Sequence, residues 1–177
     1  MTDSQLVARL RASVLVLGLA LLASSCAHGL AFVEDRRLEI TSPKGQSDVT
    51  LPFTVRWSMR DFRVTGPDGQ SDPTAGYFAV FLDRSPMPPG KSLSWIARDD
   101  KRCRRIPGCP DDQYFVDRHV YPTRTPELTV RLLPDLGTSS GHETHEVTIV
   151  LLDGGGRRIG ENAWYRTFFY DRKESVR

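Results

Sequence analysis

The sequence predicts an all-β fold, an antiparallel sandwich of seven or eight strands, from three observations. Apolar and polar residues alternate in several short runs, as they do in strands that bury one face. Loops rich in glycine and proline separate these runs. Beyond the first 25 residues there is very little helical periodicity, so the pattern favours sheets over helices.

The expected strands are short and follow one another along residues 38–170. Residues 77–82 are apolar on both faces, so we place this strand centrally or beneath a covering loop. Residues 152–157 contain three consecutive glycines and predict a tight hairpin, because glycine supplies the positive φ that such turns require. The seven expected strands lie near 38–41, 53–58, 76–83, 92–97, 115–121, 127–133 and 145–152, and a possible eighth covers about 163–170.

Two segments carry a resemblance to known domains. The run Phe53-Thr54-Val55-Arg56-Trp57 ends an early strand in a tryptophan, which resembles immunoglobulin-like and fibronectin-III-like sandwiches. The stretch 77–90, with Asp-Arg after the strand and a proline-glycine turn, is similar to uncharacterised bacterial exported domains, as is the later Leu151-Leu152-Asp153-Gly154. The resemblance covers most of residues 38–170. It implies a fold and an exported location, and it brings no catalytic motif.

The N-terminus has the three parts of a secretory signal. Arg9 and Arg11 precede an apolar run over 14–23, which is shorter than the roughly 20 residues that span a bilayer. The following Leu22-Ala23-Ser24-Ser25-Cys26 resembles the lipobox of bacterial lipoproteins, whose cysteine thiol is acylated and becomes the first mature residue. The alternatives are ordinary cleavage after Gly29 and, less favoured, a plain transmembrane anchor.

This interpretation divides the chain into four parts. Residues 1–25 form the signal peptide, 26–37 the lipidated cysteine and a flexible tether, 38–171 the sandwich domain, and 172–177 a polar tail. We expect an extracytoplasmic protein that a lipid anchor attaches to the cell membrane, or to an outer membrane if the cell has one.

The overall charge balance argues against an electrostatic footprint on nucleic acid or anionic lipid. The whole chain carries a net charge of +2, and removal of residues 1–25 takes away Arg9, Arg11 and Asp3, which leaves +1. Nucleic-acid-binding domains are usually far more basic. The 177-residue chain is long enough for one domain with a proper core after the signal is removed.

Cys103 and Cys109 are the two cysteines left in the mature part. A pair of this kind in an exported protein indicates a disulfide. Gly108 and the neighbouring prolines let the short connection turn back on itself. A metal site is the alternative, although the sequence has no second Cys/His pair to complete it. We expect the disulfide to pin an ordered insertion near residues 98–114.

Three histidines are weak candidates for metal binding. His142 and His145 are three residues apart and precede a β-run, and on a strand residues three apart point to opposite sides. Zinc proteases space two helical histidines four apart, so this pair does not match that motif. His119 would join them only through the fold. We expect no metal and no cofactor, with His142 and His145 in a polar loop that leads into a strand.

Other polar and aromatic residues are weaker candidates for sites. Ser139 and Ser140 near His142 lack the strand-turn-helix elbow of a serine nucleophile. Several carboxylates flank the cysteine loop with no calcium-loop spacing, and we expect them to neutralise the neighbouring cations on a solvated loop. Trp95 and Trp164 are expected in the core or in strand pairs, unless Trp95 is exposed beside the loop. The carboxylates are Asp99, Asp100, Asp111, Asp112 and Asp117, and the cations are Lys101, Arg102, Arg104 and Arg105.

The sequence therefore favours a binding or scaffolding module of the cell envelope over an enzyme. Sandwich domains present loops on a rigid frame and usually act by contact. An envelope protein is a possible partner. The alternative is a metal-handling or hydrolytic envelope protein that uses His119, His142 and His145.

Overall fold

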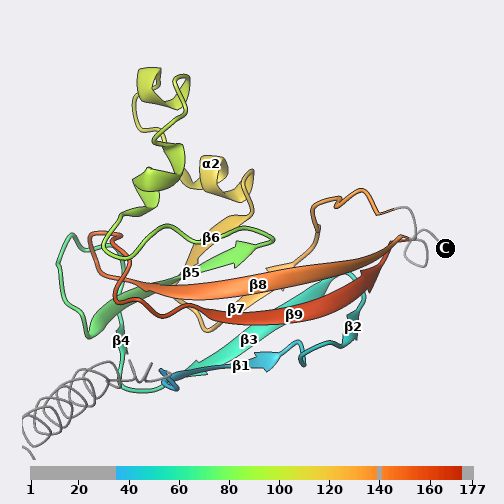
Figure 1. The fold of residues 1–177 in the computed structure, drawn as a ribbon. Coiled ribbons are helices and arrows are strands. Elements are labelled where there is room, and N and C mark those ends of the chain that lie inside the picture. The colour runs from blue at the N-terminus through green and yellow to red at the C-terminus, as the bar shows by residue number, and fades with distance from the viewer. Residues whose placement is uncertain (1–34, 139–140, 173–177) are drawn as a thin grey trace, which may run out of the picture. The chain divides into compact units, whose positions relative to one another are not determined.

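A computed structural model describes residues 35–138 and 141–172, which belong to a compact unit that begins at Asp35. This part of the chain is all-β, with sheets of mainly antiparallel strands and a few short helices (Figure 1). The strands are β1 (Leu38–Ser42), β2 (Asp48–Val49), β3 (Phe53–Met59), β4 (Arg63–Val64), β5 (Ala75–Leu82), β6 (Val120–Thr123), β7 (Glu127–Val130), β8 (His142–Leu152) and β9 (Trp164–Asp171).

The strands form two sheets. The smaller sheet has the order β1-β3-β7, and both of its pairings are antiparallel. The larger has the order β2-β9-β8-β5-β4, and β6 pairs with β5 along the same edge as β4. Its central pairs β5–β8 and β8–β9 are antiparallel, whereas the short β2 and β4 run parallel to their neighbours.

The main core lies between the two sheets. Alternate residues of β3 point inward, so Val55 and Trp57 are buried while Arg56 is exposed. The ring of Trp57 packs edge-on against Phe78 of β5, with centroids 5.3 Å apart. The other buried members are Leu38, Ile40, Val80, Leu82, Val130, Leu133, Val147, Ile149, Leu151, Phe168 and Tyr170.

A second apolar cluster covers the outer face of β5. All eight residues of this strand are buried, which confirms the prediction that both of its faces are covered. Residues 83–119 supply the cover through Met87, Leu93 and Phe115. The covering segment contains the 3₁₀ helices η2 (Leu93–Ala97) and η3 (Cys103–Arg105) and the helix α2 (Asp112–Val116).

Two expected strands are wrong. In the expected strand 92–97, residues 93–97 form η2, whose Leu93 and Ala97 are buried. Residues 115–121 contain the end of α2 and only the first part of β6. Leu93 of the first segment and Phe115 of the second pack in the apolar cluster on the outer face of β5. A short helix does this without needing a further strand partner, so tertiary packing overrides the strand propensity.

The turn after β8 folds as expected. Asp153 accepts hydrogen bonds from the backbone of Gly155 and Arg157 through Oδ1, and Leu152 pairs with Arg158 in an isolated bridge. Gly156 has a φ of +75°, which glycine adopts without strain. The chain then returns through residues 160–163 to β9, which begins at Trp164.

Candidate functional site

A network of hydrogen-bonded polar side chains lies at one end of β8. It begins at Asp83, directly after β5, where the backbone has a φ of +51°, a left-handed conformation that aspartate tolerates better than most residues. Oδ1 of Asp83 accepts the backbone N–H of Glu146 at 2.8 Å, and its own N–H donates to the carbonyl of Glu146. The carboxylate is thereby fixed against β8.

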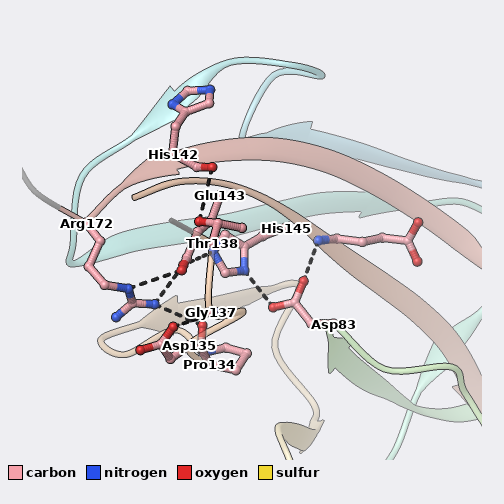
Figure 2. Close-up of polar contacts among 10 residues, drawn as sticks. Asp83, Pro134, Asp135, Gly137, Thr138, His142, Glu143, His145 and Arg172 are labelled. Atoms are coloured by element: carbon pink, nitrogen blue, oxygen red, sulfur yellow. Dashed lines mark hydrogen bonds and ion pairs between the residues drawn. The ribbon is translucent and has the colours of Figure 1, made fainter. Parts of the chain in front are cut away.

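His145 occupies the centre of this network (Figure 2). Its Nδ1 lies 2.7 Å from Oδ2 of Asp83, and its Nε2 lies 3.2 Å from Oε2 of Glu143. The His145 side chain is fully buried and its ring stacks on Phe168. Glu143 and His145 are two residues apart, so both point from β8 into the protein, on the same face as Val147.

Arg172 completes the network from the end of β9. Its Nη2 donates to Oε2 of Glu143 at 2.7 Å and to the carbonyl of Pro134 at 3.0 Å. The positive guanidinium holds the pKa of Glu143 below its ordinary value, although burial of the carboxyl works in the opposite direction. The hydrogen bond to Glu143 in turn raises the pKa of Arg172. Arg172 therefore connects β8 to the loop that follows β7.

These linked side chains form a closed network with a structural role. A catalytic histidine needs one ring nitrogen that can reach a substrate. Both nitrogens of His145 contact carboxylates, and the ring is out of reach of solvent. None of its hydrogen-bond partners is a hydroxyl or a thiol that could act as a nucleophile. The arrangement holds three segments together without offering a reacting atom.

The three candidate histidines do not come together. The expected polar loop is wrong, because β8 begins at His142 and contains both residues. His142 is exposed and His145 is buried, on opposite faces of this strand. Figure 2 shows the two rings pointing away from each other. His119 lies between α2 and β6, with a φ of +57°, and its carbonyl accepts the N–H of Leu82. Within the described residues, no group of three or more His, Cys, Asp or Glu side chains is placed to hold a metal ion.

The disulfide between Cys103 and Cys109 is present, which confirms the expected pair. Asp100 organises the insertion around it. Oδ1 of Asp100 accepts the backbone N–H of Arg102 and of Cys103, both at 2.9 Å. Its Oδ2 accepts from the hydroxyl of Tyr114 and from Arg118, each at 3.1 Å. These contacts hold the pKa of Asp100 below its ordinary value, and the backbone N–H of Cys103 contributes most.

The other carboxylates near the insertion also have local partners rather than a common focus. Asp111 caps α2 by accepting the backbone N–H of Tyr114. Asp117 accepts from Gln113 one turn earlier, and Asp99 pairs with Arg98. Each of these carboxylates, like Asp100, contacts its own partners, and within the described residues no group of three or more such side chains is placed to hold a metal ion.

The ion pairs of the insertion differ from those expected. We expected the neighbouring carboxylates to neutralise them, but Asp99 and Asp100 pair with Arg98 and Arg118 instead. Among the described residues, no ion pair involves the four exposed cations at the tip, and Ile106 beside them is 50% exposed. We call residues 101–106 the insert tip; its cations are Lys101, Arg102, Arg104 and Arg105.

Trp95 and Trp164 are partly buried. Trp95 packs against the second apolar cluster, and Lys91 and Arg98 lie over its ring at 4.9 and 4.5 Å from the centroid. With cations already on the ring, Trp95 is not an open platform for a sugar. Trp164 packs against the main core and donates its indole N–H to the carbonyl of Asp35 at 2.6 Å.

An open groove of about 430 Å³ lies between β6 and β7, next to α2. Tyr121 and Leu128, which also pack against the main core, are among its lining residues. The remaining lining residues are Asp112, Val116, Pro122, Thr123, Thr125, Glu127 and Thr129. Both flanking strands have only one partner in their sheets, and Pro122 lacks the N–H that an added strand would need.

Sequence reasoning missed Asp83, Glu143 and Arg172. The strand pattern could have indicated that Glu143 is buried, because it lies an even number of residues from the buried Val147 and Ile149 and so shares their face of β8. The partners of His145 could not be found in this way, since Asp83 is 62 residues away in the chain. The expected anchor Cys26, and also Ser139 and Ser140, lie outside the described residues.

Within residues 35–138 and 141–172, no helix has the length and apolar character needed to cross a bilayer. The chain matches no protein-family model, no curated protein and no solved structure.

Proposed function

We propose that this protein is a membrane-anchored extracytoplasmic lipoprotein whose single immunoglobulin-like or fibronectin-III-like domain acts as a non-enzymatic binding or scaffolding module of the cell envelope. The sheet orders support the finer fold assignment. The orders β1-β3-β7 and β6-β5-β8-β9 correspond to strands A-B-E and C′-C-F-G of such domains. The conserved tryptophan of antibody domains lies on strand C, whereas Trp57 lies on β3, the counterpart of strand B.

The observation that carries the binding role is the disulfide-pinned insertion. It is ordered by Asp100 and by the Cys103–Cys109 bond, yet its tip contributes no buried side chain except Cys103. A segment that is ordered but exposed has little to add to folding. Preordering a contact surface lowers the entropy that binding must overcome, so such a segment suits recognition.

The polar network supports a non-enzymatic role. Its central imidazole is buried and occupied on both sides, so the residues with the most catalytic character serve the fold. The alternative, a metal-handling or hydrolytic protein using His119, His142 and His145, has no specific geometric observation in its favour.

The anchor is tested by fractionation in the native host. Cys26→Ala should remove acylation and move the protein from the membrane fraction to the soluble exported or unprocessed pool, because the lipid is the proposed attachment. Ser25→Ala, which keeps the thiol, is the matched control and should partition like wild type. An unchanged mature mass and partition in Cys26→Ala would refute the anchor.

The binding role is tested by capture of partners from the native envelope. The lipidated wild type should retain an envelope component that the Cys103→Ser/Cys109→Ser variant retains poorly. The metal content of the isolated protein distinguishes this binding role from the metal-handling alternative. One equivalent of zinc or copper, lost in His142→Ala, would favour metal handling over contact.

A further inference from the structure

The insert tip concentrates positive charge at the end of a projecting segment. Figure 1 shows the segment around η3 standing away from the sheets, beyond η2 and α2. Four of its six residues are exposed cations, and the nearby carboxylates are used elsewhere: Asp100 pairs with Arg118 and Asp99 with Arg98. Within the described residues no ion pair neutralises Lys101, Arg102, Arg104 or Arg105, so the insert tip is a local basic patch on a chain whose net charge is only +2.

The tip is held in place from beneath. Cys103 is buried, and its disulfide to Cys109 brings the two Cα atoms to 5.3 Å. The backbone N–H of Arg104 donates to the carbonyl of Asp100, and that of Ile106 donates to the carbonyl of Cys103. The cations and the half-exposed Ile106 thus emerge from one fixed turn, and little conformational entropy remains to be lost when they bind a surface.

We propose that the insert tip docks onto the anionic phosphate headgroups of a phospholipid membrane. A cluster of cations around an exposed aliphatic side chain has the two features that peripheral membrane binding uses: attraction to anionic lipid and shallow burial of apolar area. Each cation near such a surface contributes about 1 kcal/mol, which is about fivefold in affinity. A projecting tip can meet a flat surface, whereas a peptide would be expected in a groove, and the groove between β6 and β7 is lined by Asp112 and Glu127 instead.

This inference rests on the proposed anchor for its biological setting. With Cys26 acylated, the residues between the lipid and the domain could extend over at most about 40 Å, so the domain would stay close to the bilayer. A second, weaker contact would then be intramolecular in effect and would fix which face of the domain turns outward.

Trypsin provides a direct readout, because it cuts after exposed lysine and arginine. The protein is isolated as the cell processes it and mixed at low salt with vesicles of phosphatidylcholine, alone or with phosphatidylglycerol. The disulfide is reduced after digestion, and cuts after Lys101 and Arg102 are read by mass. We expect these cuts to slow about tenfold with the anionic vesicles and to recover at high salt. Cutting after the exposed Arg131, far along the chain, serves as the reference in the same sample.

Two variants with the same change in net charge locate the effect. Arg104→Glu/Arg105→Glu should lose most of the protection of Lys101 and Arg102, whereas Lys44→Glu/Arg124→Glu, at exposed positions outside the insertion, should keep it. Equal cutting with both lipid compositions, or equal loss in both variants, would overturn the proposal. Protection by a soluble anionic envelope protein with none by vesicles would overturn it too. The readout does not need the acyl chain, so a failure of the anchor is seen separately by fractionation.

Discussion

Arg172 Nη2 and Glu143 Oε2 lie 2.7 Å apart, and this contact joins the end of β9 to a carboxylate that is 1% exposed inside the protein. Glu143 in turn reaches Asp83 through His145, so four side chains link β5, β8 and β9. Buried charges are stable only when each one is paired and hydrogen-bonded. The network therefore makes these three segments depend on one another.

Removal of Arg172 should destabilise the protein. Arg172→Gln leaves Glu143 buried without its cation, and we expect a loss of about 2–3 kcal/mol in the free energy of unfolding, since Arg172 itself is partly exposed. Urea unfolding of the full chain measures the difference. Arg131→Gln, at an exposed arginine outside the network, is the control and should change stability by less than about 0.5 kcal/mol. Equal midpoints for the two variants would contradict this account.

Glu143 should make the stability of the protein depend on acid pH. Its pKa in the folded protein is below the ordinary value of 4.5, chiefly because of the hydrogen bond from Arg172. The unfolded state therefore binds the proton more readily, and the stabilisation is present above pH 4.5 and is lost as pH falls through the folded pKa. Unfolding measured from pH 6 downward should show a shallower loss in Glu143→Gln. The same slope in both proteins would show that Glu143 is not responsible.

The two histidines of β8 should differ sharply when each is truncated. His145→Ala opens a cavity and leaves Asp83 and Glu143 facing each other without the imidazole, so we expect a loss above about 3 kcal/mol. His142→Ala changes an exposed side chain three residues away and should cost less than about 1 kcal/mol. Thermal unfolding of both variants measures the contrast. Similar losses would mean that burial does not decide the role of either ring.

The disulfide should stabilise the insertion more than the sheets. Closing a loop of about seven residues contributes about 2 kcal/mol on the chain-entropy model. Cys103→Ser/Cys109→Ser should therefore unfold cooperatively with a stability lower by about that amount. Hydrogen exchange should rise in residues 98–111 and stay low in β5 and β8. Complete unfolding of the variant would show instead that the insertion is part of the folding core.

Gly76 should tolerate no side chain. It has a φ of +153° on β5, and a Cβ there would lie 1.8 Å from the carbonyl oxygen of Leu152 on the paired strand. Gly76→Ala should destabilise by about 3 kcal/mol or more, because backbone on both strands must shift. Gly69→Ala is the control; its φ is +79°, and nothing lies within 4 Å of the added Cβ, so about 1 kcal/mol is expected. A mild effect at Gly76 would argue against the β5–β8 register.

The sequence by itself determined the all-β fold class and the burial of both faces of residues 77–82. These follow from the two-residue period of a strand, which is a local property. The disulfide could also be predicted from the sequence, because Cys103 and Cys109 are only six residues apart.

Only the tertiary structure decided which distant residues meet. Residues 93–97 became helical because they pack on the outer face of β5, and no local pattern identifies them as the segment that covers this strand. Asp83 and Arg172 reach His145 and Glu143 through strand pairing, and their own neighbours in sequence carry no sign of it. Periodicity tells which side chains share a face, but partner choice depends on sheet order and register, which long-range packing sets.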